Sequence, residues 1–176
     1  MSLSMSLPMS LSMHSASVPV FVRMLNNMLT WLDKAEAHAM ARKFDPNNYL
    51  GLRLAPDMLP FTRQIQIASD GAKACMSRLA GTEIPKWDDN EASLDELRAR
   101  IRKTLEHVQS FSAAQIDGSD ARALSIPMRS GDALNFSGEN FLKHYALPNF
   151  YFHSSATYML LRHAGVELGK ADFLGR

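Results

Sequence analysis

The sequence has a single cysteine, no excess of charge of one sign and no long hydrophobic run. Cys75 alone excludes an intramolecular disulfide and a cysteine-based zinc site, and its helix-core spacing predicts a buried, unreactive thiol. With 19 basic and 18 acidic side chains, the net charge of +1 offers no electrostatic attraction for nucleic acid or an anionic membrane. No stretch approaches the roughly 20 apolar residues of a membrane span. We therefore expect a cytoplasmic protein without nucleic-acid or membrane partners.

Recognisable catalytic signatures are also missing: there is no P-loop, dinucleotide fingerprint, nucleophile elbow or His-Glu-x-x-His motif. At 176 residues, 46% of them apolar, the chain is long enough for one domain with a sizeable core. Residues 1–13 form a Met/Ser/Leu repeat without the basic region or cleavage site of a signal peptide. We expect residues 1–13 to be a disordered extension, dispensable before Met9, and residues 14–176 to form the domain.

Hydrophobic periodicity predicts four helices. They are expected at about residues 17–43, 60–81, 93–108 and 138–163. The third begins with Ser93 and Glu96, which have the spacing of a capping box, and its charged neighbours place His107 at the surface. Pro148 is expected to kink the fourth helix.

The period changes to two between the third and fourth predicted helices. Residues 124–126 and 134–136 alternate apolar and polar side chains, and the segment 129–132 between them has the composition of a turn. This pattern predicts a short β-hairpin. The sequence therefore predicts an all-α fold, a four-helix bundle with a small β-hairpin before its last helix.

Two polar side chains interrupt the apolar pattern of the last helix. Asn149 and His153 are one turn apart, so they share a helix face. Burying an amide and an imidazole without hydrogen-bond partners is costly, so another side chain, a metal or a ligand must satisfy them. The second helix offers Gln64, Gln66 and Asp70 as polar candidates. We predict that His153 faces the second helix, in one pocket with Asn149 and either Gln66 or Asp70.

Apolar side chains surround the last predicted helix on nearly every side, more than one seam of a bundle can bury. They are Phe150, Tyr151, Phe152, Tyr158, Met159, Leu160 and Leu161. A helix that is apolar all round needs cover on more than one face. We therefore expect the protein to form at least a homodimer.

Several blocks of sequence resemble an uncharacterised bacterial family, a domain of unknown function. The blocks are residues 15–27, 54–58, 63–70, 147–153 and 161–174. They are long enough to be specific, and the resemblance extends over nearly the whole chain after Met9. It implies the DinB/YfiT-like fold, a four-helix bundle whose better-known members bind a divalent metal.

The metal-binding relatives carry one histidine on the second helix and a His-x-x-x-His pair on the fourth. Here the pair is Asn149-x-x-x-His153, and the second helix has no histidine. An amide is a weak ligand for zinc or nickel, which prefer imidazole. His153 and Asp70 are thus candidates for a weak divalent-metal site, and a metal-free pocket is the alternative.

Three functional hypotheses follow, and whether the protein is an enzyme stays open. The first is an uncharacterised DinB-like protein with a small polar pocket and a binding or stress-related role, for which a small-molecule ligand is possible. The second is a divalent-metal-dependent transferase or hydrolase, by analogy with the fold. The third is a dimeric structural or interaction protein.

Overall fold

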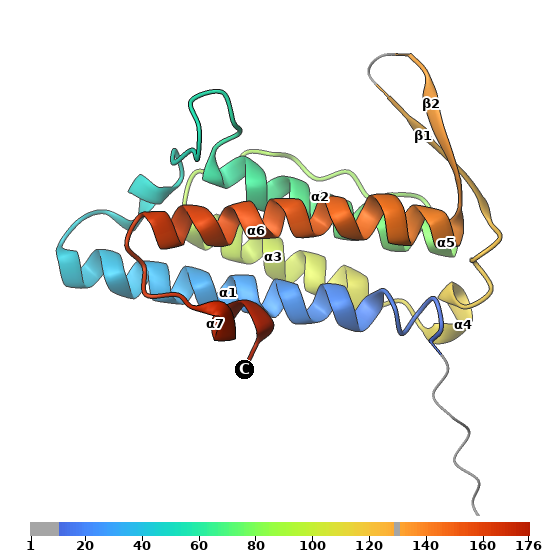
Figure 1. Ribbon diagram of the computed structural model, residues 1–176, viewed down its shortest axis with the longest axis horizontal. Helices are drawn as coiled ribbons and strands as arrows, with labels where there is room; N and C mark the ends of the chain where they lie inside the picture. The colour runs from blue at the N-terminus through green and yellow to red at the C-terminus, as the bar shows by residue number, and fades with distance from the viewer. Residues whose placement is uncertain (1–10, 129–130) are drawn as a thin grey trace, which may run out of the picture.

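Four long helices pack side by side in the computed structural model, which describes residues 11–128 and 131–176 (Figure 1). They are α1 (Val18–Arg42), α2 (Phe61–Ala80), α3 (Leu94–Gln109) and α6 (Leu147–His163). The predicted four-helix bundle is therefore confirmed. The predicted dispensable segment before Met9 lies outside the described residues. No helix of the described ranges has both the length and the apolar character required to cross a membrane.

Short elements connect and flank the long helices. They are η1 (Pro46–Tyr49), α4 (Ala113–Ile116), β1 (Ala123–Pro127), β2 (Ala133–Ser137), α5 (Gly138–Phe141), the π-helical turn η2 (Leu142–Ala146) and α7 (Lys170–Leu174). Ser93 caps α3 as predicted, because its hydroxyl accepts a hydrogen bond from the Glu96 backbone N–H at 3.2 Å.

The chain runs along the bundle in the order up, down, down, up. α2 and α3 are parallel, and both are antiparallel to α1 and α6 (Figure 1). Parallel neighbours require a long return, which the extended segment 82–92 supplies by running back along the bundle. This order places one face of α2 against α3 and another against α6.

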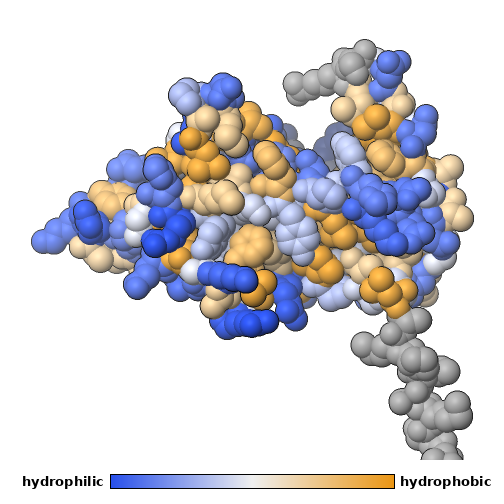
Figure 2. Space-filling model, viewed as in Figure 1, coloured by the Kyte–Doolittle hydropathy of each residue, from blue (hydrophilic) through white to orange (hydrophobic). Residues whose placement is uncertain are grey.

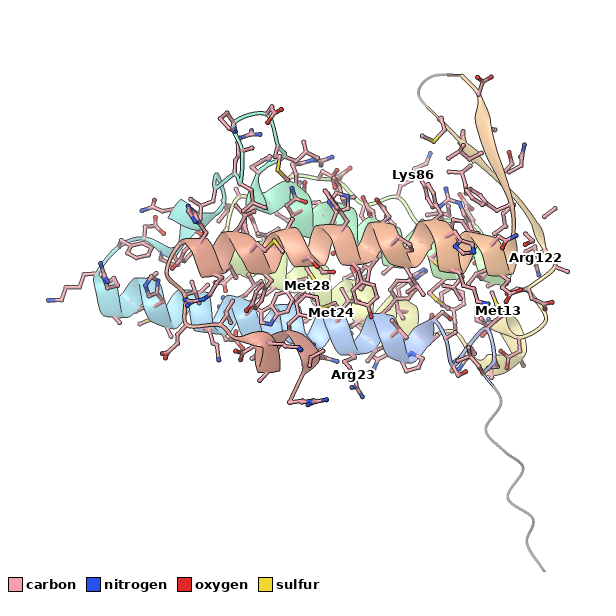
Figure 3. The ribbon with its side chains drawn as sticks, viewed as in Figure 1. Met13, Arg23, Met24, Met28, Lys86 and Arg122 are labelled. Carbon is pink, nitrogen blue, oxygen red and sulfur yellow. The ribbon has the colours of Figure 1, made fainter. Side chains whose placement is uncertain are left out.

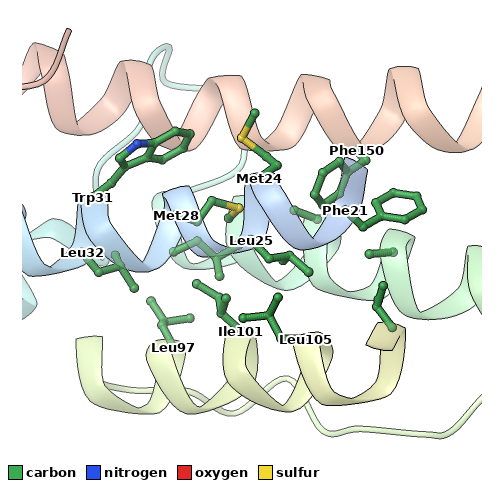
Figure 4. Packing of buried hydrophobic residues seen from close by; sticks show 14 of the residues in the cluster. Phe21, Met24, Leu25, Met28, Trp31, Leu32, Leu97, Ile101, Leu105 and Phe150 are labelled. Atoms are coloured by element: carbon green, nitrogen blue, oxygen red, sulfur yellow. The ribbon is translucent and has the colours of Figure 1, made fainter. Parts of the chain in front are cut away.

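The core follows the predicted apolar seams. Leu97, Ile101 and Leu105 of α3 point towards the apolar side chains of α1 (Figure 4). Between α1 and α6, the rings of Phe21 and Phe150 meet edge to face with their centroids 4.8 Å apart, a favourable geometry for an aromatic pair.

Cys75 is fully buried in this core, as predicted. Burial raises the pKa of its thiol far above the ordinary value, although the nearby Arg78 acts in the opposite direction. A thiol that stays protonated is a poor nucleophile.

The predicted β-hairpin is also confirmed. β1 and β2 are antiparallel, with Leu124 opposite Phe136 and Ile126 opposite Leu134. Ile126 is buried against the bundle. The hairpin leads directly into Gly138, where a Cβ would overlap the carbonyl oxygen of Ser119. The hairpin is therefore held against the end of the bundle where the last helical segment begins.

The last helical segment departs from the prediction of one helix kinked at Pro148. It is divided into α5, η2 and α6, and Pro148 lies in the first turn of α6. There the missing N–H of proline costs little. The irregularity is the π-helical turn that precedes the proline, and such wider turns often accompany functional sites.

The C-terminal segment, for which no period is visible, forms the short helix α7 against α1. The indole of Trp31 stacks on Phe173 at 5.6 Å and donates from Nε1 to the Asp172 carbonyl at 3.2 Å. Asn27 Nδ2 donates to the Phe173 carbonyl at 2.9 Å. Two side chains of α1 therefore anchor the end of the chain.

The N-terminal end of the described chain is anchored as well. Met13 packs against the core, and the His14 backbone N–H donates to Asp117 Oδ1 at 2.8 Å. Met13 lies at the same end of the bundle as Arg122 (Figure 3). At least this last residue of the predicted 1–13 extension is thus part of the fold.

Candidate functional site

A cavity of about 250 Å³ opens between α2, η2, α6 and β1. Its polar lining residues are Asp70 and Arg78 of α2, Tyr145 of η2 and Asn149 of α6, and the rest of the lining is mainly apolar. Two of the predicted pocket residues, Asp70 and Asn149, therefore line one space. An apolar cavity with a few convergent polar groups is the usual form of a small-molecule site.

Helical spacing explains why α2 contributes several groups to this wall. Asp70, Ala74 and Arg78 are separated by four residues each, so they follow one face of the helix. α6 lies in contact distance of this face, because a Cβ built at Gly71 would lie 3.8 Å from Asn149 Nδ2. The small residues thus leave room, and the long polar residues border it.

The π-helical turn builds the opposite wall. Tyr145 and Ala146 lie in η2 and line the cavity together with Phe141 of α5. The rings of Tyr145 and Phe141 stack with centroids 5.8 Å apart. The tyrosine is therefore held in place by packing and is half-buried beside the space.

His153 faces α2, as predicted, but its hydrogen-bond partner is Gln64 rather than Gln66 or Asp70. Its Nδ1 lies 2.7 Å from Gln64 Oε1, and the residue is 8% exposed. Gln64 Nε2 donates to the Leu59 carbonyl at 2.9 Å. Because a carbonyl only accepts, the amide orientation is fixed, and Nδ1 must carry the imidazole proton.

The electrostatic state of His153 follows from its burial. Burial lowers the pKa of the imidazole, which favours the neutral form. With the proton on Nδ1, the lone pair is on Nε2, which makes no hydrogen bond to the described residues. His153 and Gln64 thus form a buried pair along the same helix–helix seam as Asn149.

Gln66 lies on a different face of α2, contrary to the predicted pocket. Its Oε1 accepts from Arg63 Nη1 at 2.7 Å, and its Nε2 donates to Glu91 Oε2 at 2.7 Å. Residues two apart in an α-helix point about 200° apart, so Gln64 and Gln66 cannot both face α6. Gln66 is therefore part of the contact between α2 and the extended segment 82–92.

Asp70 lies at the border between the cavity and a buried ionic cluster. Its Oδ1 lies 2.7 Å from Lys73 Nζ and 3.0 Å from Arg100 Nη2. Arg100 also pairs with Asp89 at 2.9 Å and Glu91 at 2.8 Å. We define Arg100, Asp70, Asp89, Glu91 and Lys73 as the Arg100 cluster. It occupies one carboxylate oxygen of Asp70, and no ion pair or hydrogen bond joins Oδ2 to the described residues.

Arg78 is the cavity residue that sequence reasoning missed. Its side chain is half-buried and forms no ion pair or hydrogen bond within residues 11–128 and 131–176. Its guanidinium carbon lies 5.9 Å from the centre of the Phe141 ring. Burial lowers the pKa of Arg78, partly offset by Tyr145 and Cys75. The spacing of two turns from Asp70 was the available signal.

His107 differs from its prediction as a surface residue. It is half-buried on α3, with Nε2 3.1 Å from Ser77 Oγ, and its ring lies edge-on to Trp87 and Phe111. Burial lowers the pKa of His107; a backbone hydrogen bond with Lys73 raises it to a smaller extent, and the charge of Lys73 lowers it further. The extended segment 82–92, which carries Trp87, covers the face of α3 that periodicity assigned to solvent.

The donor set does not fit a tight transition-metal site. No three His, Cys, Asp or Glu side chains converge within the part of the chain that the structure describes. His153 supplies one imidazole nitrogen, and Asn149 supplies an amide. Asp70, the other predicted ligand, has Oδ1 engaged by Lys73 and Arg100, which leaves a single oxygen, Oδ2, for another partner. Zinc and nickel need several imidazole or thiolate ligands, which this seam lacks.

A larger cavity, about 620 Å³, lies between α1 and the C-terminal segment. Among its lining residues are Lys34, His38 and Asp172. Lys34 and Asp172 pair with each other at 2.6 Å, and His38 Nδ1 lies 2.6 Å from the Tyr49 hydroxyl. Its main polar groups are thus already partnered, which makes the smaller cavity the stronger candidate.

Comparisons with known proteins identify relatives of the whole chain. The model of a family described as a domain of unknown function (DUF1993) matches residues 13–174. The chain is also similar to a solved structure described as a DinB family member protein from Shewanella denitrificans. The two are 41% identical over 93% of this chain and 92% of that chain, with a TM-score of 0.86. No curated protein matches the chain.

Proposed function

We propose that this chain, which belongs to the DUF1993 family and shares the fold of a DinB family member, binds a small organic molecule in the cavity between α2, η2, α6 and β1. The observation that carries this proposal is the group of polar side chains around a mainly apolar space: Asp70, Arg78, Tyr145 and Asn149. Its volume of about 250 Å³ lies just below the range for drug-sized ligands, so a small metabolite fits best.

Binding is better supported than a reaction. A catalytic site for group transfer or hydrolysis requires a nucleophile beside a base, or a metal with an open position. The lining has no serine, threonine, cysteine or histidine. His153, the nearest imidazole along the seam, is bonded through Nδ1 to Gln64.

Filling the cavity tests this proposal. Ala74→Phe should occupy the space between Asp70 and Arg78 and abolish binding of small ligands while the bundle stays folded. Ala41→Phe, which fills the larger cavity at the other end of α1, is the matched control and should leave binding unchanged. NMR titration, followed at the backbone amides of Gly71 and Asn149, measures the effect. Binding that survives in Ala74→Phe would contradict the proposal.

We also propose that the protein forms a homodimer through the outer face of α6. The supporting observation is the exposure of Phe152 (59%) and Met159 (53%), which are seven residues apart and so follow one stripe. The face that carries α6 has hydrophobic residues in its middle and more hydrophilic residues towards its ends (Figure 2). Exposed apolar side chains gathered on one face are typical of an interaction surface.

Light scattering at micromolar concentration tests the homodimer. We expect twice the mass of the chain for the wild type and the mass of a monomer for Phe152→Lys combined with Met159→Lys. Met40→Lys is the control, because Met40 is 70% exposed on another helix. A monomeric wild type would contradict this proposal and leave the proposal of a ligand site unaffected.

A further inference from the structure

We infer that the ligand of this cavity is a small ω-amino carboxylic acid, whose carboxylate pairs with Arg78 and whose amine lies at Asp70. This inference rests on the proposed function, since it names the chemical class that the same cavity would take. It follows from which side chains of the cavity already have partners and which do not.

Arg78 provides the anion site. The other half-buried or buried arginines of the bundle each have at least one counterion: Arg98 and Arg100 pair with three carboxylates each, and Arg63 pairs with Asp89. Arg78 pairs with none among the described residues, although burial already disfavours its charge. Its guanidinium carbon lies 5.9 Å from the centre of the uncharged Phe141 ring, which is no counterion. A planar guanidinium in this situation binds a carboxylate through two parallel hydrogen bonds.

Asp70 provides a site for a donor at the other end. Lys73 and Arg100 both contact its Oδ1, while Oδ2 has no partner in residues 11–128 and 131–176. Asn149 lines the cavity beside it and offers an amide oxygen and an amide nitrogen. An ammonium or other hydrogen-bond donor of the ligand therefore has two acceptors at this end.

The distance and the lining between the two ends define the rest of the ligand. Asp70 and Arg78 are two turns apart on one face of α2, which separates their Cα atoms by about 12 Å. Both side chains reach into the cavity, so their charged groups lie closer together than the Cα atoms do. Ala74 and Ile67 of α2 and Ile126 of β1 line the same cavity. An apolar lining between two polar ends suits a short methylene chain.

Charge complementarity selects the zwitterion. The cavity lining has one cationic side chain, Arg78, and one anionic side chain, Asp70. The Arg100 cluster that contains Asp70 has three carboxylates and two cations, so the Asp70 end is the more negative one, and a ligand with one negative and one positive end matches both ends. A diamine would bring a positive group to Arg78. Inorganic phosphate or a dicarboxylate would bring a second negative charge near Asp70. Like-charge contacts of this kind disfavour the wrong partner.

Five probes of matched size and one anion test the inference by NMR titration at constant ionic strength. The probes are 5-aminovalerate, pentanoate, pentanamide, cadaverine, glutarate and inorganic phosphate. We expect 5-aminovalerate to bind most tightly and pentanoate next, with cadaverine and phosphate weakest. Arg78→Gln should weaken both monocarboxylates by about tenfold or more, because a charge-assisted bidentate pair is lost. It should leave pentanamide unchanged.

Arg102→Gln is the matched control, because Arg102 is exposed on α3 and forms no ion pair with a described residue. This variant should bind all probes as the wild type does. Tighter binding of cadaverine or phosphate than of 5-aminovalerate would overturn the inference, and so would an Arg78→Gln variant with unchanged carboxylate affinity. In those cases Ala74→Phe would still abolish binding if the proposed function holds. Failure of every probe to bind would overturn the inference, and the proposed function would then depend on the Ala74→Phe test alone.

Discussion

The two long faces of α2 carry polar side chains of opposite character. Towards α3, the Arg100 cluster joins a buried arginine to three carboxylates at 2.8–3.0 Å. Towards α6 and the hairpin, Arg78 borders a cavity and meets no carboxylate in the described chain. Both arginines come from helices with similar apolar seams. The difference lies in the partners that the described chain supplies: Arg100 meets three carboxylates and Arg78 meets none, and this contrast is the basis of the proposed ligand site.

The Arg100 cluster explains how an extended segment is held against the bundle. Residues 82–92 have no regular secondary structure, yet the ring centre of Trp87 lies 4.4 Å from Lys73 Nζ and 4.7 Å from Lys103 Nζ. Arg63 pairs with Asp89 of the same segment. Cation–π contacts and ion pairs thus replace the hydrogen bonds that a helix or strand would provide.

The largest loss of stability is expected from a substitution of Arg100. Its side chain is 2% exposed, so Arg100→Met leaves Asp70, Asp89 and Glu91 without their shared cation. We expect the free energy of unfolding to fall by about 3 kcal/mol, because removing one partner of a buried ion pair leaves uncompensated charge. Urea denaturation followed by circular dichroism measures this loss. Arg78→Met is the matched control and should change stability little, because no pair is broken. Equal losses in the two variants would remove the distinction between the two faces.

A smaller loss is expected at His153. His153→Ala leaves Gln64 Oε1 buried without a donor and opens space between α2 and α6. We predict destabilisation by roughly 1–3 kcal/mol, the usual cost of a buried polar group that loses its partner. Thermal and urea denaturation test this. Gln64→Ala should cost a similar amount, and the double variant less than the sum of the two, because the two residues share one hydrogen bond. Additive losses would show that the pair is not coupled.

Acid should weaken the bundle through two imidazoles, the buried one of His153 and the half-buried one of His107. Burial lowers the pKa values of His153 and His107 in the folded chain. The unfolded chain therefore takes up more protons below a pH of about 6.5, the ordinary pKa of histidine. The contribution of the neutral imidazoles to stability is therefore fully present above a pH of about 6.5 and decreases as the pH falls below that value. We expect His153→Gln to show a smaller loss between neutral and mildly acidic pH than the wild type. An equal loss would assign the acid sensitivity to other groups.

Further acidification should act on the other face of α2. Burial raises the pKa of Glu91, but hydrogen bonds from Arg100 and Gln66 outweigh this effect and hold it below its ordinary value. Its contribution to stability is therefore present above the unfolded pKa of about 4.3 and is lost as the pH falls through the folded value. The two faces of α2 therefore lose their contributions to stability in different pH ranges, and the imidazoles are protonated first as the pH falls.

The sequence predicted the parts of the fold that repeat regularly. Four apolar periodicities and one change of period identified the long helices and the hairpin. Periodicity also placed Asn149 and His153 on the face towards α2, but the predicted partner of His153, Gln66 or Asp70, was wrong, because the partner is Gln64. The choice of partner depends on the rotation of α2 about its axis, which tertiary packing decides.

The features that sequence reasoning missed are short or depend on contacts distant in sequence. α7 has five residues, too few for a visible period, and it is ordered by contacts with Trp31 and Asn27 of α1. The π-helical turn has the same residue types as an α-helix. An arginine on a helix is usually solvated, so the sequence gives no sign that Arg78 is half-buried. Its burial results from the hairpin and α5, which contribute Ile126 and Phe141 to the same cavity.

The smallest effect is expected from added metal ions. The wild-type seam offers one free imidazole nitrogen, on His153, and the amide of Asn149, so Zn²⁺ should leave the melting temperature unchanged. Asn149→His places a second imidazole one turn from the first on the same helix face, the spacing of a two-histidine metal pair. We expect this variant to gain a rise in melting temperature that depends on Zn²⁺ and is reversed by a chelator.

Asn149→Ala is the control and should respond to Zn²⁺ no more than the wild type does. A Zn²⁺-dependent rise in the wild type that His153→Ala abolishes would contradict the expectation, because it would show that one imidazole and an amide suffice at this seam. No rise in Asn149→His would show that the Gln64–His153 hydrogen bond holds the ring away from its neighbour. In that case the seam is committed to its hydrogen-bonded pair as firmly as the opposite face of α2 is committed to its ion pairs.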